Sequence, residues 1–318
     1  MESSGRVRGR GAISNRSGRF ERAVREAVDD GWERDEDLSP LRTSVTTDAT
    51  RTILTRNTSP DVPFEISINP YRGCEHGCVY CFARPSHAFL GLSPGLDFET
   101  RLLAKPDAPR LLRAALARPG YRPGTIAIGT NTDPYQPVEK RLRIMRGLLE
   151  ILSETRHPVA IVTKGRLIER DADLLGPMGR DGIAAVGISL TTLDAALARA
   201  MEPRAAAPAH RLRAIETLAK AGVPVRVMLA PVVPGLTDHE IEAILAAARD
   251  AGATAATQIV LRLPREVAEL WREWLETRFP DRAGKVMRRV REIHGGRDYD
   301  AAWGRRMRGE GVHAELIA

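Results

Sequence analysis

The three cysteines of this 318-residue chain all lie within eight consecutive positions. Cys74, Cys78 and Cys81 occupy the run ISINPYRGCEHGCVYCFAR, with the spacing C-x3-C-x2-C. An odd number of thiols at such close spacing does not form an ordinary disulfide framework. Thiolates are metal ligands, so three of them on one short loop indicate a metal centre. The fold is therefore expected to be organised around this loop.

The number of ligands distinguishes between the metal centres that such a loop can bind. Structural zinc usually takes four protein ligands, so His76 or His87 would have to complete a zinc site. A [4Fe–4S] cluster has four irons, and each needs one ligand outside the cluster. Three cysteines would leave one iron open to a small molecule. Gly73 and Gly77 bracket the first turn of the loop, where close packing around a cluster needs small residues.

The segment CEHGCVYC resembles the cluster loop of radical S-adenosylmethionine (SAM) enzymes, including the aromatic Tyr80 before the third cysteine. The resemblance implies that Cys74, Cys78 and Cys81 hold a [4Fe–4S] cluster whose open iron binds the amino and carboxylate groups of SAM. It also implies reductive cleavage of SAM to a 5′-deoxyadenosyl radical that abstracts hydrogen from a substrate. A one-electron reductant such as flavodoxin or ferredoxin is then an expected partner. Tyr80 is expected to form a flat wall of the cofactor site, with its backbone free to meet adenine.

Composition excludes a membrane-spanning protein. The chain is 43% hydrophobic and 28% charged, as is usual for a globular protein with a full core. No apolar stretch reaches the roughly 18 residues that a membrane span needs. The first residues include arginines but no apolar segment of a secretory signal. We therefore expect a cytoplasmic location, which suits reduced thiols.

Charge admits a nucleic-acid partner without requiring one. The net charge is +7 and the pI is about 9.7. The strongest basic bias lies in Lys285–Arg297 and in Trp303–Arg308, where an aromatic residue is close to several arginines. Such a surface can bind nucleic acid. Arginines scattered along helices are more often simply solvated.

Strand patterns alternate with helical ones along the middle of the chain. Strands are predicted at Phe64–Asn69, Thr125–Gly129, Pro158–Val162, Ile183–Ser189, Val225–Leu229 and Thr257–Leu261. Helices are predicted at Phe20–Val28, Ala108–Ala117, Val138–Thr155, Glu169–Leu175, Pro208–Ala221, Asp238–Ala251, Glu266–Phe279 and Ala283–His294. Connections of this length allow parallel strands.

These units predict an α/β fold, a partial (β/α)6 TIM-like barrel with a polar N-terminal arm and a helical C-terminal tail. A doubly wound sheet is the alternative that periodicity leaves open. The barrel is favoured because the cysteines follow the first strand, and barrel chemistry gathers at the carboxyl ends of strands. The predicted boundaries are a polar extension over 1–60, a core over 61–264 and a helical extension over 265–318.

Polar residues follow the later strands as well. The second strand runs into GTNTDPYQPVE, where radical SAM enzymes meet the amino group of the cofactor, so the resemblance makes Asn131, Thr132 and Asp133 candidates. The alternative is an ordinary turn with a helix cap. Three further cofactor-binding candidates follow the third and fourth strands, namely Lys164, Ser189 and Arg204. Arg204 is a candidate because its guanidinium suits a bidentate contact with the SAM carboxylate.

The wording TDPYQPVE and the triplet Thr163-Lys164-Gly165 resemble the spore photoproduct lyase-like branch, also described as DNA-repair photolyase-like. The chain also resembles an uncharacterised bacterial group in that branch, including its RGRGA arm. Spore photoproduct lyases use an additional cysteine to return hydrogen to the product, and this chain has no fourth cysteine.

Either a tyrosine supplies the hydrogen, with Tyr135 the catalytic candidate beside Tyr71 and Tyr121, or the reaction differs. The lyase- or photolyase-like reaction stays unassigned. The alternative function is a non-catalytic iron–sulfur or zinc protein that senses redox state and binds nucleic acid.

Overall fold

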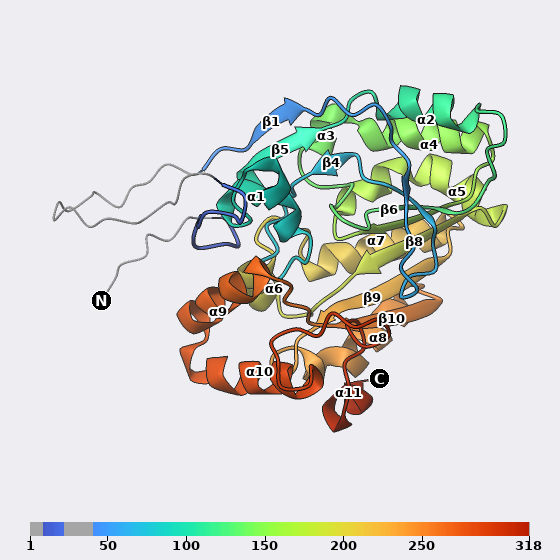
Figure 1. Ribbon diagram of the computed structural model, residues 1–318. Helices are drawn as coiled ribbons and strands as arrows, with labels where there is room; N and C mark the ends of the chain where they lie inside the picture. Colours follow the sequence, from blue (N-terminus) through green and yellow to red (C-terminus); the bar gives the residue numbers. More distant parts are fainter. Residues whose placement is uncertain (1–8, 22–40, 318) are drawn as a thin grey trace.

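A seven-stranded sheet forms the centre of the computed structural model, which describes residues 9–21 and 41–317 (Figure 1). Six neighbouring strands are parallel, in the order β3 (Ile66–Ile68), β6 (Ile126–Ile128), β7 (Val159–Thr163), β8 (Ala184–Ser189), β9 (Val225–Val232) and β10 (Ala255–Val260). The antiparallel β2 (Thr55–Arg56) adds one edge. No pairing between β2 and β10 closes the sheet within the described ranges. The predicted α/β fold with a partial barrel is therefore confirmed.

The helices between these strands bury one apolar face against the sheet. They are α2 (Ala108–Leu116), α4 (Ile144–Glu154), α5 (Ala172–Arg180), α7 (Pro208–Lys220) and α8 (Ile241–Asp250). Their buried leucines and isoleucines join one large core with the strands. A separate short helix, α6 (Ala195–Met201), follows β8, and Asp194 caps it by accepting the N–H groups of Ala196 and Leu197.

The long helix predicted over Val138–Thr155 is broken at Arg143. Its backbone is left-handed there, with φ 51°, which separates α3 (Glu139–Leu142) from α4. The buried carboxylate of Glu139 accepts the N–H groups of Ile144 at 3.0 Å and Met145 at 3.1 Å. Glu139 therefore satisfies the free N–H groups at the start of α4, which offsets the cost of the break.

A second, three-stranded sheet was not predicted from the sequence. It has the order β1 (Ser44–Thr47), β5 (Arg101–Ala104) and β4 (Tyr71–Arg72), with α1 (Leu96–Thr100) directly before β5. β1 is mostly exposed and lacks apolar alternation, so its sequence gave no strand signal. Because β4 ends just before the first cysteine, this small sheet fixes one end of the cysteine loop.

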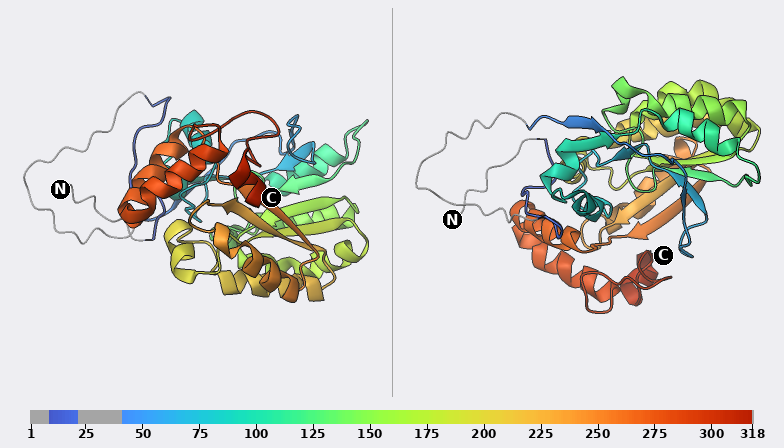
Figure 2. Two further views of the ribbon diagram at one scale, coloured as in Figure 1. Left: turned by 90° about the horizontal axis from the view of Figure 1, so that it is seen from below. Right: turned by 45° about the horizontal axis from the view of Figure 1, so that its top comes forward.

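The C-terminal helices pack against the cysteine loop. Figures 1 and 2 show α9 (Glu266–Arg278) and α10 (Pro280–Ile293), in orange, lying together and away from α2, α4 and α5. Trp271 and Trp274 of α9 are buried with their rings 4.9 Å apart. They share an apolar cluster with Val79 and Tyr80 of the loop. A last helix, α11 (Val312–Ile317), follows.

Two expectations concern the ends of the chain. The helix predicted at Phe20–Val28 lies outside the described residues except for its first two positions. Across the described ranges, none of the helices combines the length and the apolar character that crossing a membrane would require.

Candidate functional site

The cysteine loop is a tight turn held by two glycines with left-handed backbones. Gly73 has φ 77° and Gly77 has φ 69°. A Cβ atom on Gly73 would lie 2.7 Å from Leu102, and one on Gly77 would lie 2.7 Å from the carboxylate of Glu99. The glycines predicted for close packing are therefore needed for both their backbone and their size. The N–H of Cys74 donates to Phe98 O at 2.9 Å, which joins the loop to α1.

The three thiols lie in a buried environment. Cys74 and Cys78 are buried, and Cys81 is partly exposed. Burial raises the pKa of each thiol, and the negative charges of Asp133 and Glu202 raise that of Cys74 and Cys78 further. Thiolates here need added positive charge, which bound iron supplies. The donor set thus fits an iron–sulfur cluster.

A buried ion pair fixes the carbonyl groups of the loop. Arg84 and Glu99 are fully buried and lie 2.5 Å apart. Arg84 also donates to Cys78 O at 2.9 Å and to Gly77 O at 3.2 Å. The guanidinium therefore binds the loop backbone at the second cysteine and at the glycine before it. Neither residue was predicted from the sequence, because an arginine and a glutamate 15 positions apart form no recognisable motif.

The N-terminal arm closes over the same ion pair. Glu99 accepts the N–H of Gly11 at 2.9 Å and the N–H of Ala12 at 2.8 Å. A Cβ atom on Gly11 would lie only 1.7 Å from Gly77 O. Arg10 is buried and donates to Glu99 O at 2.9 Å. Residues 10–12 of the predicted polar N-terminal arm are therefore a docked part of the site.

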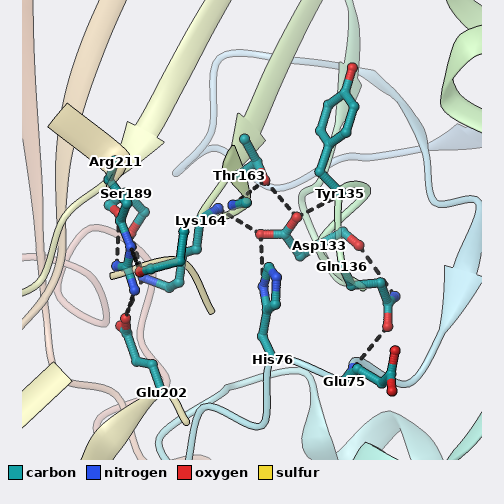
Figure 3. A network of polar contacts seen from close by, with 12 residues as sticks. Glu75, His76, Asp133, Tyr135, Gln136, Thr163, Lys164, Ser189, Glu202 and Arg211 are labelled. Carbon is teal, nitrogen blue, oxygen red and sulfur yellow. Dashed lines mark hydrogen bonds and ion pairs between the residues drawn. The ribbon is translucent and has the colours of Figure 1, made fainter. Parts of the chain in front are cut away.

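Figure 3 shows Asp133 at the centre of a polar network that joins the loop to two strand ends. One carboxylate oxygen accepts the hydroxyl of Thr163 at 2.6 Å, and the other accepts the N–H of Lys164 at 2.7 Å. His76 Nδ1 lies 3.3 Å from Asp133 Oδ2. Burial alone would raise the pKa of Asp133, but His76 and these hydrogen bonds lower it below its usual value.

Gln136 connects the predicted GTNTDPYQPVE loop to the cysteine loop. Its fully buried amide accepts the N–H of Glu75 at 2.8 Å and donates to Gly73 O at 3.2 Å. Gln136 was not predicted as a site residue. Pro134 and Pro137 stand on either side of Tyr135-Gln136 and restrict the backbone there, which is the sequence signal for an ordered Gln136.

The structure separates the three candidates of this loop. The buried hydroxyl of Thr132 donates to Tyr71 O at 2.8 Å, and Asp133 is occupied as described. The N–H of Asn131 donates to Asn69 at 3.1 Å, and its side-chain amide has no partner among the described residues. Asn131 is therefore the one of the three whose side chain is free to contact a ligand.

Lys164 and Ser189, two of the predicted cofactor-binding candidates, lie together at the ends of the neighbouring strands β7 and β8. Lys164 Nζ donates to Ser189 Oγ at 2.5 Å and to Ala230 O at 3.0 Å. It also lies 3.2 Å from Glu202 and 5.7 Å from the centre of the Tyr80 ring. Lysine, serine and the aromatic wall are thus adjacent to Cys78 on the same side of the sheet.

Glu202 contacts both Lys164 and Tyr80, and it was not predicted as a site residue. It is buried, accepts the Tyr80 hydroxyl, forms an ion pair with Arg211 and lies 2.7 Å from Thr191 Oγ1. Burial alone would raise the pKa of Glu202, but Arg211 and Lys164 hold it well below its usual range. In the sequence Glu202-Pro203-Arg204, only Arg204 was a predicted cofactor-binding residue.

Arg204 contacts the cysteine loop and not the strand ends. Its guanidinium lies 3.1 Å from Glu75 Oε1, and its N–H donates to His76 O at 3.2 Å. Thr43 donates to the same carboxylate oxygen at 2.6 Å. The guanidinium that was predicted to bind the SAM carboxylate is therefore already paired within the protein.

The tyrosine predicted as hydrogen donor points elsewhere. Tyr135 is buried, and its hydroxyl donates to Asp171 at 3.0 Å. Figure 3 shows its ring directed away from His76 and the cysteine loop. This position does not support a donor role, because the hydroxyl lies in the core between β7 and α5.

The other two tyrosines named from the sequence are also occupied. The buried hydroxyl of Tyr71 donates to Glu139 at 2.5 Å. The hydroxyl of Tyr121 lies 2.7 Å from His157 Nε2. His157 directly precedes the amino end of β7, whereas the cysteine loop lies at the carboxyl ends of the strands. The hydroxyl of Tyr80, in contrast, lies 3.4 Å from Thr191 Oγ1, just beyond the end of β8.

Comparison with known proteins gives relatives across most of the chain. The model of the radical SAM superfamily matches residues 68–248. An uncharacterized protein of Mycobacterium tuberculosis is 38% identical over 235 residues, which cover 73% of this chain and 68% of the relative. An uncharacterized protein of Methanocaldococcus jannaschii is 27% identical over 173 residues, covering 54% of this chain and 62% of that protein.

Among solved structures, spore photoproduct lyase complexed with dinucleoside spore photoproduct has a similar fold, with a TM-score of 0.55 and 16% identity. The match covers 74% of this chain and 66% of the lyase, slightly less than two thirds of its length. At this identity the match speaks for the fold alone. The fold, the cysteine loop and the family match agree, and the chain belongs to the radical SAM superfamily.

Proposed function

We propose that this protein is a radical SAM enzyme in which Cys74, Cys78 and Cys81 hold a [4Fe–4S] cluster. The observation that carries the proposal is three thiols, two buried and one partly exposed, on one loop at the carboxyl ends of parallel strands. In the described ranges, no three side chains of His, Cys, Asp or Glu converge on one point in the way that the ligands of a structural zinc ion do. In a [4Fe–4S] cluster each thiolate binds a different iron, so the thiols need not meet at one point.

SAM is proposed to lie between the cluster loop and the strand ends. The free amide oxygen of Asn131 suits the amino group of SAM. Lys164 and Ser189 suit its carboxylate from the ends of β7 and β8, where the Lys164 ammonium would exchange its bond to Ala230 O for the ligand. Tyr80 would form the wall beside adenine. Arg204 is less suited, because its guanidinium contacts Glu75 on the cysteine loop and none of the strand-end side chains that the structure describes.

The chain's own residues prepare this site. When bound, the reduced cluster would supply the electron that splits SAM into methionine and a 5′-deoxyadenosyl radical. Arg84 and Glu99 fix the loop, and the docked arm excludes water from its outer side. Glu202 and Arg211 orient Lys164 and Tyr80, whose positions set where the reactive carbon would lie.

The proposed reaction is hydrogen abstraction from a substrate, and the net charge of +7 admits nucleic acid as that substrate. The lyase- or photolyase-like outcome rests on the resemblance alone. A flavodoxin or ferredoxin is the expected reductant. A cytoplasmic location, where thiols stay reduced, suits the cluster.

Anaerobic reconstitution with iron and sulfide tests this proposal. The protein is reduced in the presence of SAM, and chromatography detects 5′-deoxyadenosine. We expect product from the parent protein and none from Cys74→Ala, Cys78→Ala or Cys81→Ala, with Ser153→Ala on α4 as the control. Normal cleavage in any cysteine variant, or binding of zinc alone, would overturn the proposal.

A further inference from the structure

Two exposed aromatic rings, one at the end of the cysteine loop and one in the C-terminal segment, each carry an arginine on one face. Phe82 directly follows Cys81 and is 42% exposed, and the guanidinium carbon of Arg262 lies 4.3 Å from its ring centre. Trp303 is 57% exposed, and the guanidinium carbon of Arg306 lies 4.1 Å from its ring centre. We call Phe82, Arg262, Trp303 and Arg306 the arginine–aromatic platform.

The two halves of the platform come from distant parts of the chain that the fold brings together. Arg262 follows the carboxyl end of β10, and Val260 at that end donates its N–H to Met307 O at 3.0 Å. Arg306 lies 2.5 Å from Asp61. Figure 1 shows the C-terminal segment, in red, passing beside β10.

Arg262 joins the platform to the cysteine loop. It packs on Phe82, the residue that follows Cys81. Burial lowers the pKa of Arg262, and the charge of Arg306 lowers it as well, whereas Tyr299, Cys81 and Asp61 oppose the shift. Charges that shift a pKa in this way act over short distances, so the guanidinium of Arg306 lies near that of Arg262.

Arg262 differs from the other partly or fully buried arginines near the site. Arg84 and Arg211 each satisfy their donors with a carboxylate and backbone carbonyls. Arg306 is paired with Asp61 and donates to Ser59 at 2.7 Å. Arg262 makes no hydrogen bond or ion pair with any residue that the structure describes. Its guanidinium donors are thus free for a ligand.

We propose that the arginine–aromatic platform binds a single-stranded nucleic acid and presents one of its nucleotides to the cluster loop. This inference rests on the proposed function and names the substrate class of that site. Bases stack on exposed aromatic rings and on guanidinium planes, while free arginine donors bind phosphate. A duplex keeps its base faces covered, so stacking on both rings requires an unpaired strand.

An acidic peptide is the other occupant to weigh, because it would also bind Arg262. Two exposed rings have no matching partner in a row of carboxylates, which favours the nucleic acid. A similar arginine–aromatic group elsewhere is Arg19 with Phe20 and Phe89, in which Arg19 pairs with Glu266 at 2.5 Å, as Arg306 does with Asp61. This group has no counterpart of the unpaired Arg262, so Phe89 supplies a matched control.

Fluorescence anisotropy of a labelled twelve-nucleotide thymidine oligonucleotide tests the inference, using the anaerobically reconstituted protein. We expect Arg262→Gln, Phe82→Leu and Trp303→Ala each to weaken binding about tenfold, as for loss of one stacked base. Arg262→Gln should also reduce the slope of log affinity against log salt by about 0.7. Arg249→Gln on α8 and Phe89→Ala should bind within about twofold of the parent protein.

Three outcomes would overturn the inference. They are no binding to the oligonucleotide, equal losses in the control variants, and tighter binding to a poly-glutamate peptide than to the oligonucleotide. Measuring 5′-deoxyadenosine in the same preparation separates this inference from the proposed function. Product without oligonucleotide binding refutes the platform alone. Platform-dependent binding without product supports the platform and refutes the proposed enzyme chemistry.

Discussion

Replacing Gly11 by alanine should detach the N-terminal arm from the cysteine loop. A Cβ atom at this position would lie 1.7 Å from Gly77 O, and the neighbouring atoms are backbone that cannot rotate away. The arm must therefore move, and it then loses the hydrogen bonds that the N–H groups of Gly11 and Ala12 make to Glu99.

The size of the effect follows from these two bonds. A hydrogen bond to a charged group contributes about 1.5–3 kcal/mol, so the two together set an upper limit near 6 kcal/mol. Glu99 keeps its ion pair with Arg84, and the displaced arm gains water contacts, so we expect a net loss of about 3 kcal/mol. That loss raises the undocked population about 100-fold, since every 1.4 kcal/mol is about tenfold.

Limited trypsin digestion after Arg10 measures this population. Arg10 is buried when the arm is docked, and cleavage follows the open population when docking is fast. Gly9→Ala is the matched control, because Gly9 has φ 75° with open space around its Cβ position. That change adds only about 1 kcal/mol of backbone strain. Cleavage rates within twofold of each other in the two variants would refute the reasoning.

Three further predictions concern the interior of the protein. Tyr135→Phe should lower the free energy of unfolding by about 1 kcal/mol, from the lost bond to Asp171, without changing 5′-deoxyadenosine formation; a lost product signal would restore its donor role. Lys164→Gln should raise the dissociation constant for SAM about tenfold, because hydrogen bonds to a charged group are lost, while leaving the cluster absorbance unchanged; unaltered SAM binding would exclude Lys164 from the cofactor site. Stability should fall as the pH drops below about 6.5, because the unfolded state gains protons on histidines that the folded state keeps neutral. Burial lowers the pKa of three of them, His87, His157 and His294. Urea midpoints that stay level between pH 7.5 and 5 would contradict this, and His294→Gln should flatten the slope.

The parallel strands and the cysteine loop were predictable because their signals are local. Apolar runs such as the one at β8 can only be buried strands between helices, and three cysteines on one loop leave few chemical alternatives. Lys164 and Ser189 were candidates because each lies where a predicted parallel strand ends, and the structure brings them together because β7 and β8 are neighbours. Their role as cofactor ligands stays a prediction.

The support of the site was not predictable because it depends on pairs far apart in the sequence. Glu99 meets Gly11 across 88 positions, and Tyr80 meets Glu202 across 122. No pattern along the chain marks such a pair. The same limit explains Tyr135, whose neighbours Asp133 and Gln136 do reach the site while its own ring turns into the core.

The docked arm also imposes an order on the making of the protein. Ser14 donates to Glu273 of α9 across 259 positions, and Arg19 pairs with Glu266 across 247. The segment that holds Ser14 and Arg19 therefore cannot reach its final place until α9 has been synthesised. Until then the side of the cysteine loop that packs against Trp271 and Trp274 of α9 is uncovered. Iron and sulfide delivered during translation would meet an accessible loop, and the arm would seat over it last.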